Sequence, residues 1–302
     1  MRLRQGTRVL DRGDGTLHVG VRSPVVLSGL STSQRRFVER LEAAKSVTNR
    51  AAAPFREIVS VLENAGLLTS QPPERRTVAV NDAGPLGLSV GVALARSGWA
   101  VHFEDTAPAS ASPPHTYAPA TLGTTRQAAA ADTVARLVPG AEVHVGTARA
   151  DAWVLISHGA PAIDAAFALM STDVPHIFVV TDERGAIVGP FAVPGEGACG
   201  LCDGLARVAV DPAWPSLALQ FRAPSVAPPN ADPDVVASMT GLVCGALGAW
   251  RAGDPRAWLD SVWSLTVAAP PASRAVAPDV DCGCGAAAPV GDELAARRSR
   301  YE

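Results

Sequence analysis

The hydrophobic pattern is most regular between residues 76 and 105. Thr77–Val80 and Ala100–Phe103 are short apolar runs typical of strands. Between them, residues 86–96 are rich in Ala and Leu with apolar side chains at helical spacing, and Gly98 ends that pattern. We therefore expect a strand, a tight turn, a helix and a second strand in succession.

The turn in this unit reads Asp-Ala-Gly-Pro-Leu-Gly and ends at Gly87. Gly84 and Gly87 let backbone N–H groups approach a phosphate at the helix N-terminus, and Asp105 can hold a ribose hydroxyl. This is the layout of one mononucleotide-binding half of a Rossmann-type sheet. Asp82 stands where such a turn usually has its first glycine, and its carboxylate would repel an anion. Alternatively, Gly84 and Gly87 only permit tight packing of the helix on the strand.

Strand and helix patterns alternate after a Pro/Ala/Ser-rich loop at residues 106–120. This alternation implies a mostly parallel sheet with right-handed crossovers. Strands are expected at 142–145, 152–156 and 175–180, with helices at 123–138 and 161–171. Further on we expect a strand at 185–194 interrupted by Gly-Pro, a buried helix at 231–252, a strand or helix at 257–267, and a polar tail at 292–302.

Residues 1–70 predict a separate, winged-helix-like α+β module. Two short strands flank a hairpin turn at residues 11–15, a third strand follows at 25–27, and amphipathic helices follow at 33–45 and 52–65. Basic residues are interleaved with acids and no basic recognition helix is present, which argues against DNA binding. A peptide added as a strand to the exposed sheet edge fits better.

Composition narrows the function classes. The chain has 302 residues, 47% hydrophobic and 18% charged, enough for two globular domains. A net charge of −3 gives no general attraction to nucleic acid or membrane. Lys45 is the only lysine, which excludes a Walker-type phosphate lysine. The N-terminus lacks a signal-peptide pattern and no run reaches the ~18–20 apolar residues of a membrane span, so we expect a cytoplasmic protein.

Four cysteines occur as two close pairs. Cys199 and Cys202 form a CxxC motif, and Cys282 and Cys284 form a CxC motif about 80 residues later. Four thiolates can fill the tetrahedral coordination of a zinc ion, which would then be structural and clip the C-terminal tail onto the sheet domain. Free thiols and a redox CxxC are the alternatives; the second is less favoured because no helix start with a thioredoxin-like context is expected around Cys199. Cys244, in an apolar helix, is interpreted as a core thiol.

Together these features resemble the ThiF/MoeB/HesA adenylyltransferase superfamily, which is also the core of ubiquitin-activating enzymes. The resemblance covers nearly the whole chain and rests on DAGPLG, TTRQAAA, PGAEV and the CxxC…CxC pair. More narrowly, the run VGPFAVPGEGACGLCDGL…DPAWPSLALQ resembles actinobacterial cyclodehydratase-like proteins that bind leader peptides in thiazole/oxazole-modified peptide biosynthesis.

The resemblance implies a peptide-recognition module at residues 1–70 and a ThiF-like domain with its zinc clip at residues 76–302. It implies a homodimer, and ATP with Mg²⁺ as the cofactors of active members. Gly84 and Gly87 match the phosphate turn, Asp105 matches the ribose acid, and Arg126 falls where the family has a phosphate-contacting lysine.

Several departures from the family pattern remove charge from this site. His158-Gly159 stands where active members carry an Asp-Asn pair, and Asp164 is a poor substitute one helical turn later. The basic residues expected after Asp105 are replaced by Thr-Ala-Pro-Ala. At a few kcal/mol each, such losses would disable adenylation.

We therefore expect no catalytic residues for adenylation. The expected role is to bind a precursor's leader beside the second or third N-terminal strand and the helix after Ala52, and to present it to a separate YcaO-type cyclodehydratase. The alternative is an active adenylyltransferase using Asp105, Arg126 and either His158 or Asp164. An NAD- or FAD-dependent oxidoreductase has only the dinucleotide-like turn in its favour.

Overall fold

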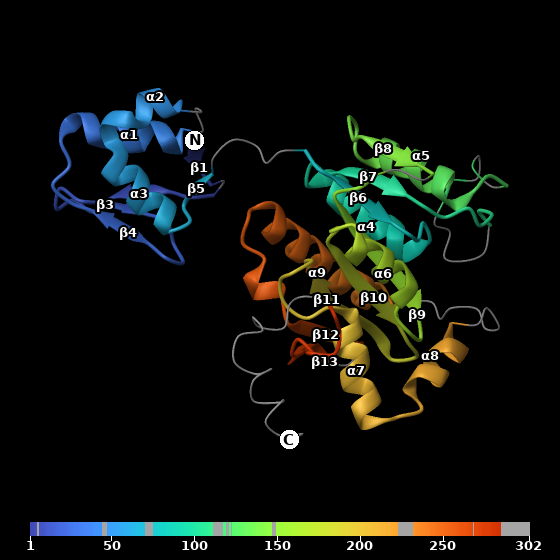
Figure 1. Cartoon of the computed structure of the whole chain (residues 1–302). Helices are drawn as coiled ribbons and strands as arrows, with labels where there is room; N and C mark the ends of the chain where they lie inside the picture. The colour runs from blue at the N-terminus through green and yellow to red at the C-terminus, as the bar shows by residue number, and fades with distance from the viewer. Residues whose placement is uncertain are drawn as a thin grey trace, which may run out of the picture. The chain divides into compact units, whose positions relative to one another are not determined.

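The computed structural model describes residues 1–4, 6–43, 47–69, 75–110, 117–118, 121, 123–146, 149–222, 232–267 and 269–284. The chain divides into two compact units, Met1–Glu74 and Arg75–Glu302, each with a hydrophobic core of its own (Figure 1). The polar tail expected at residues 292–302 lies outside the described residues, as do residues 111–116 and 119–120 of the loop expected at 106–120.

The first unit combines small antiparallel sheets with short helices. A three-stranded sheet has the order β2-β3-β4, and β1 pairs with β5. The elements are β1 (Arg2–Leu3), β2 (Val9–Asp11), β3 (Leu17–Val19), β4 (Val25–Leu27), α1 (Thr32–Glu42), α2 (Asn49–Ala52), the 3₁₀ turn η1 (Ala53–Phe55), α3 (Arg56–Asn64) and β5 (Leu68–Thr69).

Side-chain alternation gives the three-stranded sheet one buried and one open face. Leu17, Val19 and Leu27 are buried and join a core that includes helix residues such as Phe37 and Leu62. The opposite face carries the row Leu10–His18–Val26, which the strand register places side by side.

Local signals explain where these elements begin and end. Gly13 and Gly15, in the turn between β2 and β3, both have positive φ, which favours glycine. Ser31 and Gln34 form a capping box at the start of α1. The helix expected at 52–65 is instead divided into α2, η1 and α3, and Pro54 lies within η1.

The second unit is built on an eight-stranded sheet of order β13-β12-β11-β10-β9-β6-β7-β8. The strands from β10 to β8 in this order pair in parallel, whereas β11, β12 and β13 pair in antiparallel fashion, so the sheet is mixed. The elements are β6 (Thr77–Val80), α4 (Pro85–Arg96), β7 (Ala100–Phe103), α5 (Arg126–Leu137), β8 (Val143–Val145), β9 (Ala152–His158), α6 (Ile163–Ser171), β10 (His176–Thr181), β11 (Gly185–Ala192), α7 (Gly200–Val210), α8 (Trp214–Phe221), α9 (Pro233–Arg251), the 3₁₀ turn η3 (Arg256–Trp258), β12 (Ser261–Thr266) and β13 (Ala269–Ala275).

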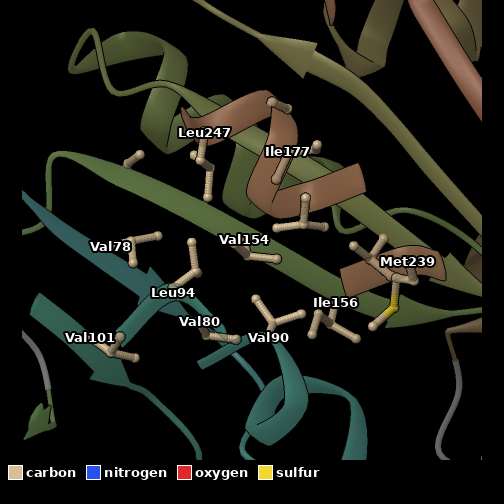
Figure 2. Packing of buried hydrophobic residues seen from close by; sticks show 14 of the residues in the cluster. Val78, Val80, Val90, Leu94, Val101, Val154, Ile156, Ile177, Met239 and Leu247 are labelled. Carbon is tan, nitrogen blue, oxygen red and sulfur yellow. The ribbon is translucent and has the colours of Figure 1, made fainter. Parts of the chain in front are cut away.

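Helices cover both faces of this sheet. Helices α4, α5 and α9 pack on one face in the main core, and α6 packs on the other against Leu155 and Phe178. Figure 2 shows aliphatic side chains from the sheet, α4 and α9 meeting in that main core: Val78, Val80, Val90, Leu94, Val101, Val154, Ile156, Ile177, Met239 and Leu247. Burial of each such side chain stabilises the fold by about 1.5–3 kcal/mol.

Three features of the second unit add to or differ from what the sequence predicted. Strand β11 continues through Gly189 and Pro190, which are joined by a cis peptide bond, and the expected interruption takes the form of a register shift in its pairing with β10 between Val188 and Phe191. Helix α7 was not expected. Within 257–267, where a strand or helix was expected, the chain forms η3 and then β12.

The outer strand β13 is exposed along its length and carries Pro270 and Pro271. Among the described residues, no helix is long and apolar enough to cross a membrane.

Candidate functional site

Two glycines in the turn after β6 lie close to neighbouring atoms, Gly87 to the Asp82 backbone and Gly84 to the Arg126 side chain. Gly84 is the N-cap of α4, and Pro85 occupies the first turn. A Cβ at Gly87 would lie 1.9 Å from the Asp82 carbonyl oxygen, and one at Gly84 would lie 2.4 Å from Arg126 Nη2. Close packing against the backbone therefore requires glycine at position 87, whereas at position 84 a side chain would have to displace the end of Arg126.

The Asp82 carboxylate lies inside this turn. Its Oδ2 accepts the Gly87 N–H at 2.9 Å, and its Oδ1 accepts Arg126 Nη2 at 2.8 Å. Asp82 does not have a positive φ, so the backbone accommodates an aspartate without strain. The carboxylate thus accepts hydrogen bonds from an amide at the helix N-terminus and from a guanidinium, two donors that could otherwise bind an anion.

Asp105 is engaged in the same cluster. Its Oδ2 accepts the Ala83 N–H at 3.0 Å and pairs with Arg126 Nε at 3.1 Å, while Oδ1 accepts the Ala107 N–H at 3.0 Å. The Tyr117 hydroxyl donates to the Ala83 carbonyl. The carboxylate expected to hold a ribose is therefore used in internal bonds.

Two carboxylates share one guanidinium at this point of the fold. Burial alone would lower the pKa of Arg126, but the charges of Asp82 and Asp105 outweigh it and hold that pKa above its ordinary value. Burial raises the pKa of the Asp82 carboxyl, against the opposing Gly87 N–H bond and Arg126 charge. The cluster carries a net charge of −1 when all three groups are ionised, which disfavours a phosphate.

His158 and Asp164, the other residues considered for nucleotide binding, contact protein groups outside this cluster. His158 Nδ1 lies 3.1 Å from the Thr181 hydroxyl. Asp164, which is exposed, forms an ion pair with Arg222 at 2.7 Å. Neither contact replaces the acidic and basic groups whose absence the sequence indicates.

Asn81 is a structural residue that the sequence reasoning missed. Its Nδ2 donates to the Ile156 carbonyl at 3.1 Å, and its Oδ1 accepts the Ile156 N–H at 2.7 Å. The side chain thus continues the pairing of β6 with β9 beyond the end of β6. An amide directly after a buried strand was the available signal.

The four paired cysteines converge in the second unit. Their Sγ atoms all lie within 4.8 Å of one another. The distances are 3.8 Å for Cys199–Cys202, 3.3 Å for Cys199–Cys282 and 3.7 Å for Cys202–Cys284. Four Zn–S bonds of about 2.3 Å in a tetrahedron place sulfurs about 3.8 Å apart, so this donor set fits a structural zinc ion.

One observation weakens the sequence argument against a redox pair. Cys199 is the N-cap of α7, so the CxxC lies at a helix start that the sequence did not indicate. The convergence of four thiols is what favours a metal. Cys244 is separate from the cluster, and burial raises the pKa of its thiol to about 11.

The two edges of the three-stranded sheet in the first unit differ: a side chain of the unit bonds to the β2 edge, whereas the β4 edge is open. Gly20 N donates to Arg8 O and Arg12 N donates to Thr16 O, so in β2 the Val9 N–H points outward. Glu42 of α1 accepts that N–H at 3.0 Å and closes the β2 edge.

The same alternation places the Val26 N–H and C=O on the outer edge of β4. Leu17↔Leu27 and Val19↔Val25 are then the hydrogen-bonded pairs of β3 and β4. Within the described part of the chain, no hydrogen-bond partner lies on the outward groups of Val26. This edge presents one free donor and one free acceptor with the spacing that an extended peptide requires.

No protein-family model and no curated protein matches the chain. Several solved structures do match the chain. The chain has the fold of a ThiF-type α/β protein, with a mostly parallel central sheet behind small N-terminal sheets, as the sequence predicted. That fold is shared with E. coli MccB, at 13% identity and a TM-score of 0.63, covering 96% of this chain and 98% of that one.

Two further structures match at similar levels. The microcin C7 biosynthetic enzyme MccB in complex with N-formylated MccA has a TM-score of 0.62 and 13% identity, over 94% of this chain and 99% of that one. PaaA has a TM-score of 0.57 and 13% identity, over 91% of this chain and 100% of that one. At such identities the likeness establishes the fold alone.

Proposed function

We propose that this chain binds the leader of a ribosomally made precursor peptide and presents it to a separate YcaO-type cyclodehydratase in thiazole/oxazole-modified peptide biosynthesis. It does so without adenylating the peptide. The observation that carries the proposal is the open edge of β4. The leader adds to this edge as an extra strand.

The order of strands selects β4 among the three. Strand β3 is central and pairs on both sides, so the second strand, which the sequence left as a candidate, has no free edge. Strand β2 is closed by Glu42. Backbone hydrogen bonds to Val26 supply affinity, and side chains of the peptide that point toward α3 supply specificity.

The comparisons support a peptide-directed role. A protein of the same fold, the microcin C7 biosynthetic enzyme MccB, has been solved in complex with N-formylated MccA. Its match extends over nearly the whole chain, including the N-terminal unit. We carry peptide binding to this chain on that basis, and the choice of leader and of partner enzyme rests on the sequence resemblance.

The Asp82 cluster supports the loss of adenylation. A triphosphate at the turn would have to displace a carboxylate from Gly87 N–H and from Arg126. It would also approach a cluster that is already negative. Loss of one charge-directed contact to a reacting phosphate costs about 3 kcal/mol in transition-state stabilisation, and here several are lost together.

The proposal includes a structural zinc ion held by Cys199, Cys202, Cys282 and Cys284. All four ligands come from protein, so the ion has no open position and takes no part in chemistry.

Val26→Pro tests the edge. Proline removes the outward N–H of residue 26 and breaks no β3–β4 hydrogen bond, so the sheet survives. Binding of a precursor peptide encoded beside this gene, measured by fluorescence anisotropy on the full chain, should weaken about tenfold, the loss of one backbone hydrogen bond.

Val26→Thr is the matched control, because it keeps both the N–H and the β-branched shape. It should bind like the unmodified chain. No binding of the peptide at tens of micromolar, or equal binding by Val26→Pro and Val26→Thr, would contradict the proposal.

The second candidate is an active adenylyltransferase. It is favoured by the retained Gly84, Asp105 and Arg126, and by the match to MccB solved with ATP, at a TM-score of 0.61 and 13% identity. ATP–pyrophosphate exchange separates the two. Exchange that disappears in Asp105→Ala would support the enzyme, and its absence in the unmodified chain supports the binding protein.

A further inference from the structure

Two distant segments must meet to form the four-cysteine cluster. Cys199 and Cys202 lie at the start of α7, and Cys282 and Cys284 follow β13. No metal is needed to explain why β13 returns to α7, because protein contacts already join these segments. Asp260, between η3 and β12, makes the most direct of them.

Asp260 bonds to both segments at once. Its Oδ1 accepts the N–H of Ala198, the residue before Cys199, at 2.6 Å. Its backbone carbonyl accepts the N–H of Val276, the residue after β13, at 2.9 Å. Ala198 and Val276 are buried in the small core that also holds Cys199 and Cys202.

Asp260 adopts an unusual backbone conformation to do this. Its φ is +54°, a left-handed value that costs a non-glycine residue about 1 kcal/mol. Gly197, opposite, has φ +70°, and a Cβ there would lie 2.9 Å from Asp260 Oδ1. The absence of a side chain at Gly197 thus leaves the room that the Asp260 carboxylate occupies.

Asp203 makes a second connection beside Cys202. It is 5% exposed, and its Oδ1 and Oδ2 pair with Arg274 Nη2 of β13 at 2.5 Å and with Arg207 Nε at 3.0 Å. The carboxylate joins α7 to the last strand before the second cysteine pair. It is buried and fully engaged, so it adds rigidity to the same junction.

We propose that Asp260 is a positioning residue for the four-thiolate metal site, holding the two cysteine segments together before a metal ion arrives. Asp203 and Arg274 act as a second tie. The inference rests on the structural zinc of the proposed function and is independent of peptide binding. According to this proposal, folding of the chain already brings the thiolates together, so the metal binds a preformed set of ligands.

Metal titration of the reduced, metal-free full chain tests this. Co²⁺ gives visible absorption bands characteristic of tetrahedral thiolate ligation, and Zn²⁺ affinity follows by competition with a chromophoric chelator. Asp260→Asn keeps an oxygen acceptor and tolerates the left-handed conformation, so its Zn²⁺ affinity should stay within about threefold of the unmodified chain.

Asp260→Gly separates positioning from backbone strain. Glycine relieves the strain but removes the acceptor, so Tm should change little while Zn²⁺ affinity falls about tenfold, the effect of one lost hydrogen bond to a charged group. The Co²⁺ bands should also weaken or shift. A purely structural role would move Tm and leave the spectrum unchanged.

Arg274→Gln provides a second variant should Asp260→Gly fold poorly. It removes the ion pair to Asp203 and should lower Zn²⁺ affinity several-fold while Co²⁺ ligation stays tetrahedral. Unchanged affinity in both Asp260→Gly and Arg274→Gln, or no thiolate bands in the unmodified chain, would overturn the proposal.

Discussion

Asp82 changes the chemistry of a turn without changing its shape. The glycines that shape a phosphate-type turn are present, but a carboxylate from the chain itself accepts the hydrogen bonds. The same bond to Gly87 caps the first turn of α4, so we expect the residue both to stabilise the helix and to disfavour anions at the turn.

Replacing Asp82 by Ala should therefore have two opposite effects. Loss of the cap should lower the free energy of unfolding by about 1 kcal/mol. Release of Gly87 N–H and Arg126 should raise the affinity for MgATP or pyrophosphate by about tenfold or more, because one nearby carboxylate is removed. Isothermal titration calorimetry on both proteins measures the second effect.

Asp82→Asn keeps the size of the side chain and removes its charge, and should give an intermediate affinity. If the unmodified chain binds nucleotide as tightly as Asp82→Ala, the carboxylate does not close the turn.

Cys244 should be chemically silent. With a pKa of about 11, its thiol is protonated at pH 8 in all but about one molecule in a thousand. The reactive thiolate appears only as the pH rises toward 11, so alkylation at pH 8 should be slow with or without metal. Mass spectrometry after brief iodoacetamide treatment at pH 8 should find Cys244 unmodified; rapid modification of Cys244 would contradict the raised pKa of its half-buried thiol.

At the level of elements, the centre of the sheet depends on a side chain. Strands β6 and β9 are paired only as far as Val80 and Val154, and the Asn81 amide then bonds both backbone groups of Ile156. This keeps the carboxyl ends of the two strands together where the turn to α4 begins.

Asn81→Leu should destabilise the second unit by about 2–3 kcal/mol, because the N–H and C=O of Ile156 each lose a partner. Urea unfolding followed by far-UV circular dichroism measures this. Asn81→Asp keeps the acceptor for the Ile156 N–H but turns an oxygen toward the Ile156 C=O, so it should also destabilise the unit; unchanged stability in either variant would mean that the two bonds do not support the fold.

Elements with an uninterrupted local pattern could be predicted from the sequence, and others could not. Strand β6, helix α4 and strand β7 follow apolar runs bounded by glycine. Helix α7 was missed because glycines at 200 and 204 weaken its helical pattern. Strand β13 has no buried side chain, so no alternation marks it.

The candidate site shows the same division. The four cysteines were identifiable from their spacing, Gly84 from the turn, Asp105 from the end of the second strand, and Arg126 from the family resemblance. The bond from Asp82 to Arg126 depends on how α5 returns to the sheet, over 44 residues of chain. The role of Asp260 depends on segments 62 residues apart, so no local pattern could indicate it.

For the molecule as a whole, the main core and the cysteine cluster are separate. The main core is formed by the sheet with α4, α5 and α9, whereas the cysteines belong to a small cluster around Ala198 and Val276. Metal loss should therefore leave the sheet intact and loosen at most the residues beyond Val276, which Asp260 holds without a metal.

Treatment with a zinc chelator should lower Tm by mass action, because the ion binds only the folded chain. Far-UV circular dichroism at 25 °C should change little, and limited proteolysis should show new cleavage near Cys282. Global loss of secondary structure would show that the metal holds the whole second unit together.

The prolines on β13 have a consequence for self-association. Proline has no amide hydrogen, and side chains and amides alternate along a strand, so one of Pro270 and Pro271 leaves a gap in the row of donors facing outward. A strand of a second molecule therefore cannot form a complete set of hydrogen bonds with β13, which disfavours edge-to-edge growth of the large sheet into fibres. The open edge of β4 in the first unit can thus accept a peptide strand, while the edge of β13 in the second unit disfavours pairing with another copy of the chain.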